Sequence, residues 1–84
     1  MFTLPDFNNL PPDPELYPLT DEVVLDRLRL NVGYMCFAGV NRYDIIEQQQ
    51  LLMELKRRGV PEDDIVAAMD LGHIEGTEIR DRIL

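Results

Sequence analysis

The side chains that most often carry out chemistry are scarce in this chain. It contains one cysteine, Cys36, one histidine, His73, and no serine. A serine triad is therefore excluded, and a cysteine–histidine pair would need Cys36, in a first helical segment, to meet His73 in a distant loop. We expect instead that Cys36 packs as a small hydrophobic residue and that His73 is an exposed or loop-packing side chain.

Metal and cofactor sites are not expected either. A zinc site needs about three or four protein ligands, and one cysteine with one histidine cannot supply them. The adjacent acids Asp21 and Glu22, and likewise Asp63 and Asp64, fall at predicted helix starts, where the helix dipole favours negative charge. Neither a glycine-rich phosphate loop nor a calcium loop is found. The sequence predicts a protein that is not an enzyme and has no cofactor.

The net charge of −8 is unevenly distributed over the 84 residues. Residues 1–26 contain only acids, residues 27–59 have an excess of bases, and residues 60–84 are acidic again. Because affinity for nucleic acid or anionic lipid comes from surplus Lys and Arg, and the chain has a single lysine, we expect neither nucleic acid nor a membrane as its partner. A lone cysteine indicates a reducing compartment, and we expect a cytoplasmic origin.

The first nineteen residues form a proline-rich arm, with five of the six prolines of the chain. Proline fixes φ and removes an amide donor, so the arm should be extended rather than helical. Large apolar side chains are spaced along it, which is unusual for a solvated tail. We interpret them as a docking segment, either on the chain's own helices or on a partner. The predicted partner-binding residues are Phe2, Leu4, Phe7, Leu10, Leu16, Tyr17 and Leu19.

Residues 20–84 are predicted to form one helical domain. Thr20 followed by two acids is typical of a helix start, and apolar residues at helical spacing predict a helix over about 21–38. An alternating pattern over 28–37 is also compatible with a strand, but no second strand is available to pair with it. Gly33 within a helix costs about 1 kcal/mol relative to alanine, so we expect a close contact there.

Two or three further helices follow along the chain. Asn41 starts the second, which Gly59 ends and which we expect to be the central helix. Pro61 opens the third, which we expect to end at Gly72. After a loop over 73–76, Thr77 should cap a short last helix. The predicted fold is all-α, a compact bundle of three to four short helices behind the extended arm.

The C-terminal segment carries two resemblances to known families. A glycine-containing connection, with Ile65, Ala67 or Ala68, Leu71 and Ile79 around it, resembles a DNA-binding helix-turn-helix. The same stretch, with Gly59-Val60, Ala68-Met69 and Ile83-Leu84, also resembles a ubiquitin-associated three-helix module. Both patterns are common to small helix hairpins, so neither is adopted as a family assignment.

A small core, an arm rich in prolines and aromatics and no catalytic set predict an interaction protein. We expect a structural or adaptor subunit of a larger assembly such as a virion, with other protein subunits, or further copies of itself, as partners. A chain this short buries only about 60 % of its unfolded surface, which favours stabilisation by association. One alternative is a helix-turn-helix regulator.

The main alternative, ahead of the helix-turn-helix regulator, is an acidic regulatory protein that inhibits a nucleic-acid enzyme. It requires the C-terminal acids to form one continuous surface that imitates phosphates, without pairing to arginines such as Arg27, Arg29 and Arg80. Those acids are Asp63, Asp64, Asp70, Glu75, Glu78 and Asp81.

Overall fold

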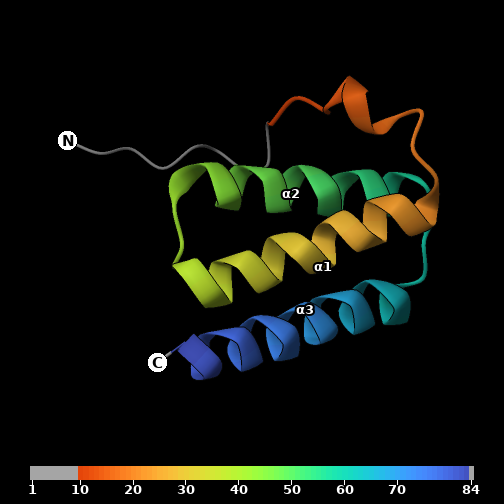
Figure 1. Ribbon diagram of the computed structural model, residues 1–84. Helices are drawn as coiled ribbons and strands as arrows, with labels where there is room; N and C mark the ends of the chain where they lie inside the picture. Colours follow the sequence, from red (N-terminus) through yellow and green to blue (C-terminus); the bar gives the residue numbers. More distant parts are fainter. Residues whose placement is uncertain (1–9, 84) are drawn as a thin grey trace.

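Three α-helices lie side by side in the computed structural model, which describes residues 10–83 (Figure 1). A single 3-10 turn, η1 (Pro14–Leu16), precedes α1 (Asp21–Ala38), α2 (Arg42–Arg57) and α3 (Glu62–Ile83). The described residues contain no strand, so the strand alternative for 28–37 is wrong and the helix predicted over 21–38 is confirmed. The all-α fold is confirmed with three helices.

The predicted helix ends of α1 and α2 are confirmed by their hydrogen bonds. The Thr20 hydroxyl accepts from the amide of Val23 at 3.3 Å, and the Asn41 side chain accepts from the amide of Asp44 at 3.0 Å. Gly59 has a φ of 76°, which a residue without a side chain adopts at little cost. The Val60 amide then donates to the carbonyl of Leu55 at 3.1 Å, which closes a Schellman turn.

The central helix is α1, and the expectation that α2 would be central is wrong. Figure 1 shows α1 between α2 and α3, which barely touch each other. The reason is that α1 packs through two surfaces: apolar side chains face α2, and small residues face α3. The buried core joins all these elements and consists of Leu16, Val24, Leu28, Val32, Leu51, Leu55 and Ile65.

Helix α3 is continuous, so the predicted end at Gly72, the loop over 73–76 and the Thr77 cap are wrong. Gly72 and Gly76 lie buried in mid-helix against α1. A Cβ atom on Gly72 would overlap the carbonyl oxygen of Arg29, and one on Gly76 would overlap that of Gly33. The close contact predicted at Gly33 is thus confirmed, and these glycines serve helix packing instead of ending a helix.

The continuity of α3 also removes the turn on which both family resemblances depended. A helix-turn-helix and a ubiquitin-associated module each need a break where this chain has a straight 22-residue helix. None of the described helices is both long enough and apolar enough to cross a membrane.

The described part of the arm, residues 10–19, packs on the chain's own helices. Leu16, at the end of η1, is 3 % exposed within the core. The carbonyl of Leu16 accepts a hydrogen bond of 2.7 Å from the Arg58 guanidinium of α2. Phe2, Leu4 and Phe7 lie outside the described residues.

Candidate protein-binding face

An apolar groove runs between α1 and α3, and the glycine contact forms its floor. Its volume is about 220 Å³, and its lining includes Gly33 and Gly76. Because these residues have no side chains, the helices approach closely and leave the groove shallow. The remaining apolar lining comes from Leu30, Tyr34 and Phe37 of α1 and from Ile79 of α3. We call this set the α1–α3 groove.

An ion pair lies at one end of the α1–α3 groove. Arg29 Nη1 donates to both carboxylate oxygens of Glu75 at 2.9 Å, and its Nη2 donates to Asp26 Oδ1 at 2.6 Å. The hydrogen bonds to Asp26 and then to Glu75 raise the pKa of Arg29. These contacts join α1 to α3 beside the glycines and leave the rest of the groove apolar.

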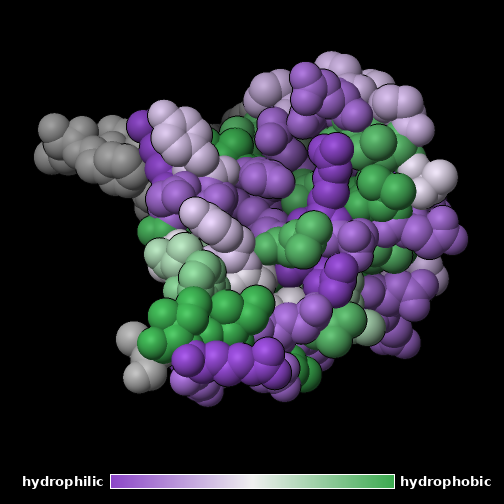
Figure 2. Space-filling model, in the orientation of Figure 1, coloured by the Kyte–Doolittle hydropathy of each residue, from purple (hydrophilic) through white to green (hydrophobic). Residues whose placement is uncertain are grey.

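The apolar residues of the groove are exposed to solvent. Leu30 is 59 % exposed, Tyr34 54 % and Phe37 39 %, and Ile79 is 46 % exposed. Leu30, Tyr34 and Phe37 follow one another at i, i+4 and i+7, so they form one stripe along α1. Figure 2 shows hydrophobic surface gathered near the C-terminal ends of α1 and α3. Contiguous apolar surface of this kind marks interaction sites on small proteins.

A second hollow, of about 440 Å³, lies between α1 and α2. Leu30 and Tyr34 line it as well, so the two side chains form a ridge between the groove and this hollow. Its polar lining comes from Arg27, Asn31, Asp44 and Glu47. We call this site the α1–α2 hollow.

Two side-chain oxygen atoms at the α1–α2 hollow are buried and have no hydrogen-bond partner in the part of the chain that the structure describes. They are Oδ1 of Asn31 and Oδ2 of Asp44. Asn31 is 7 % exposed, and its Nδ2 donates to the Asp44 carbonyl at 3.1 Å. Burying an unsatisfied acceptor costs about 1–3 kcal/mol, so the hollow favours a ligand that donates hydrogen bonds.

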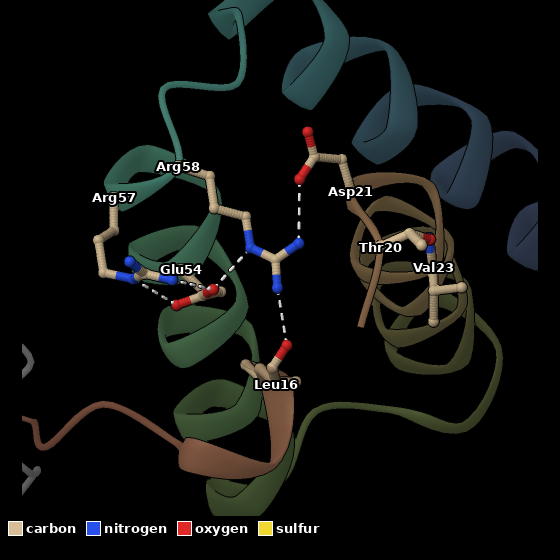
Figure 3. Close-up of polar contacts among 7 residues, drawn as sticks. All are labelled: Leu16, Thr20, Asp21, Val23, Glu54, Arg57 and Arg58. Atoms are coloured by element: carbon tan, nitrogen blue, oxygen red, sulfur yellow. Dashed lines mark hydrogen bonds and ion pairs between the residues drawn. The ribbon is translucent and has the colours of Figure 1, made fainter. Parts of the chain in front are cut away.

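A polar cluster around the buried Glu54 fastens the arm to α1 and α2 (Figure 3). The Glu54 carboxylate accepts from Arg57 Nη2 at 2.7 Å and from Arg58 Nε at 2.6 Å. Arg58 also donates to Asp21 at 3.0 Å. Hydrogen bonds from Arg57 and Arg58 outweigh the effect of burial and lower the pKa of Glu54 from 4.5 to about 2. The cluster is structural because its donors and acceptors already satisfy one another.

Cys36 and His73 lie together, contrary to the sequence-based expectation. Cys36 Sγ is 3.1 Å from His73 Nδ1, with the thiol partly buried and the imidazole exposed. The prediction that Cys36 and His73 lie apart was wrong because the loop expected at 73–76 is part of α3, and α3 lies parallel to α1. One signal in the sequence could have revealed the pair. Each of the two residues lies three positions from a glycine of the helix contact: Cys36 from Gly33, and His73 from Gly76. The contact is a hydrogen bond between the thiol and the imidazole, and the tautomer of the ring decides which of them donates.

The predicted arm residues within 10–19 have different environments. Leu10 and Leu19 are half-buried, and Leu16 is part of the core. Tyr17 is 48 % exposed, and the Arg57 guanidinium lies 5.1 Å from its ring centroid. The structure therefore uses Leu16 to complete the chain's own core, while Tyr17 keeps accessible surface. Sequence reasoning missed Leu30, Tyr34, Phe37 and Ile79 as surface residues, because helical spacing alone does not show which apolar face stays uncovered.

The C-terminal acids form only part of the surface that an acidic inhibitor would need. Glu75 pairs with Arg29, and Asp81 lies 3.9 Å from Arg80. Asp63, Asp64, Asp70 and Glu78 are exposed along α3, with exposed Val66, Leu71 and Ile74 on the same helix. The inhibitor hypothesis stays a prediction.

Comparisons with known proteins give no relative for this chain. No family model matches it, and no curated protein or solved structure matches it significantly. Within residues 10–83, no three His, Cys, Asp or Glu side chains are arranged to hold a metal ion. Function must therefore be argued from the surface itself.

Proposed function

We propose that the chain is a protein–protein interaction subunit that docks onto other protein through the α1–α3 groove and its ridge. The observation that carries the proposal is the exposure of Leu30, Tyr34 and Phe37 beside a groove with a glycine floor. The groove is smaller than the roughly 300–1,000 Å³ of sites that enclose a small-molecule ligand. It has the right size for one or two apolar side chains of a partner.

Fewer residues of the arm are available for docking in this proposal than the sequence analysis predicted. Since Leu16 is part of the core and Tyr17 keeps accessible surface, docking by the arm would rely on Tyr17 and on Phe2, Leu4 and Phe7. Deleting residues 1–9 should weaken association with the partner and leave the urea unfolding midpoint of the isolated chain unchanged. A lowered midpoint would instead assign those residues to the stability of the chain itself.

Peptide selection tests the groove directly. Random twelve-residue peptides displayed on phage are selected on the immobilised chain, and the enriched peptides are titrated by fluorescence anisotropy. Tyr34→Ala should weaken their binding by about tenfold or more, as truncating an aromatic hot spot does. Val66→Ala is the matched control, because Val66 is 46 % exposed on α3 and does not line the groove. The proposal fails if nothing is enriched, or if both variants bind the peptides like the wild type.

A further inference from the structure

The α1–α2 hollow calls for a positively charged donor from outside the chain. Its two buried acceptors, Asn31 Oδ1 and Asp44 Oδ2, have no hydrogen-bond partner among residues 10–83, and Glu47 adds a second carboxylate. A guanidinium suits such a site because its planar fork offers several N–H donors to oxygen acceptors. Asp44 is only half-buried, so rotation of its carboxyl group can bring its oxygen to an entering donor.

Arg27 is the cation that the chain itself offers. It is exposed, at the rim of the same hollow, and forms no hydrogen bond or ion pair with the described residues. Two other arginines are engaged in ion pairs: Arg29 with Asp26 and Glu75, and Arg58 with Glu54 and Asp21. An uncommitted arginine beside unsatisfied acceptors fits a reciprocal contact between two copies.

The spacing along α1 matches such a contact. With a rise of about 1.5 Å per residue, Arg27 and Tyr34 lie about 5 Å on either side of the midpoint between Leu30 and Asn31. A two-fold axis through that midpoint sets two α1 helices antiparallel and places Arg27 of each copy over Tyr34 of the other. Tyr34 and Asn31 line the hollow that the guanidinium would enter, and the tyrosine ring can also receive a cation on its face.

We propose that the partner is a second copy of this chain, docked antiparallel along α1, with Arg27 of each copy in the α1–α2 hollow of the other. The inference rests on the proposed function, since it names the occupant of the same ridge. Leu30 of both copies meets at the axis, and Tyr34 and Phe37 are covered on either side. The interface is isologous, so each polar contact occurs twice.

The available area predicts a weak dimer. The 18 residues of α1 extend about 27 Å, and two helices side by side present a face about 20 Å wide. Roughly 500 Å² per copy, or about 1,000 Å² in total, lies at the lower limit of specific interfaces. The dimer should therefore dissociate on dilution within the micromolar range.

A charge exchange tests the pairing. Sedimentation equilibrium of the full chain should show a mass rising from 9.7 kDa toward twice that value with concentration. Arg27→Asp and Asp44→Arg should each raise the dissociation constant by about tenfold or more, because each homodimer then brings like charges together twice. An equimolar mixture of the two variants should restore association, since every contact in the mixed dimer joins opposite charges.

Controls separate folding from association. Arg27 is exposed and forms no hydrogen bond or ion pair with the described residues, so Arg27→Asp should fold normally by circular dichroism. Leu30→Glu, at the axis, offers a second disruptive variant. Two control variants, Lys56→Asp and Asp63→Arg, change charge at exposed positions outside the proposed interface. Neither should change the dissociation constant of the dimer.

Several results would overturn the inference. A wild-type chain that stays monomeric at the highest concentration, a mixture no better than its components, or a dimer indifferent to both Arg27→Asp and Leu30→Glu would each do so. If the chain is monomeric yet binds selected peptides through Tyr34, the proposed function stands and only the self-association is wrong. If it is monomeric and selects no peptides, both fail.

Discussion

Replacement of Gly72 by alanine tests whether the α1–α3 contact decides the fold. In an exposed helix the change would be favourable by about 1 kcal/mol, because alanine has the higher helix propensity. Here the new Cβ atom would overlap the Arg29 carbonyl oxygen and lie 3.0 Å from its carbonyl carbon. Backbone atoms cannot rotate away as a side chain can, so α1 and α3 must separate.

The expected cost follows from these contacts. Overpacking of this kind costs about 1–3 kcal/mol and occasionally more. The cost should fall at the upper end of this range, because the new Cβ atom overlaps backbone atoms and the Arg29–Glu75 contact, now 2.9 Å, lengthens as the helices separate. After the propensity gain is subtracted, Gly72→Ala should lower the free energy of unfolding by about 2 kcal/mol. That is a large part of the roughly 4–13 kcal/mol expected for a domain of this size.

Urea unfolding followed by circular dichroism at low protein concentration measures this change. With a slope of about 1 kcal/mol per molar urea, the midpoint should fall by about 2 M. Two variants calibrate it. Gly33→Ala should cost less, because its Cβ would stop 3.1 Å from the Gly72 oxygen, and Ala67→Gly, on the exposed side of α3, reports propensity alone. A midpoint that rises in Gly72→Ala would refute the close packing of α1 on α3.

Three further predictions concern the polar cluster, the thiol and the arm. Glu54→Gln should destabilise the protein by about 2 kcal/mol at pH 7. Because the pKa of Glu54 is lowered to about 2, the stability that its charge contributes is complete above pH 4.5 and is lost as the pH falls toward 2. The urea midpoints of variant and wild type should therefore converge near pH 2. His73→Ala should slow the alkylation of Cys36 by iodoacetamide about threefold or more at pH 7, since the thiol loses its hydrogen bond to the imidazole; an unchanged rate under native conditions would show that the 3.1 Å contact has no chemical effect. Leu16→Ala should cost about 2–4 kcal/mol in urea unfolding, whereas a cost near zero would mean that residues 10–19 do not pack on the helices.

Local signals predicted most of the helix ends correctly. Thr20, Asn41 and Gly59 act on amides and carbonyls a few residues away, so their roles can be inferred without knowledge of the rest of the chain. The apolar spacing of α1 was equally informative, because a period near 3.6 is a property of one segment. Each of these predictions concerns interactions within one turn of the residue involved.

The glycines of α3 show where local reasoning is insufficient. Gly72 resembles a helix stop when only its propensity is considered, yet its contact with the Arg29 carbonyl compensates for that weakness within a continuous helix. The contact partner lies more than forty residues away, and no local pattern specifies it. The misplaced loop then concealed the approach of His73 to Cys36 and the groove above Gly76.

By itself, the sequence determined that this is an all-helical, acidic chain in which Thr20, Asn41 and Gly59 mark helix ends, because propensity, capping and charge act over one or two turns. Only the tertiary structure decided which helix is central, that α3 runs unbroken, and which apolar side chains remain exposed. Those properties depend on pairwise packing between distant segments, where a missing Cβ atom or one carbonyl oxygen determines how closely two helices approach. The binding face around Leu30 and Tyr34 follows from that packing.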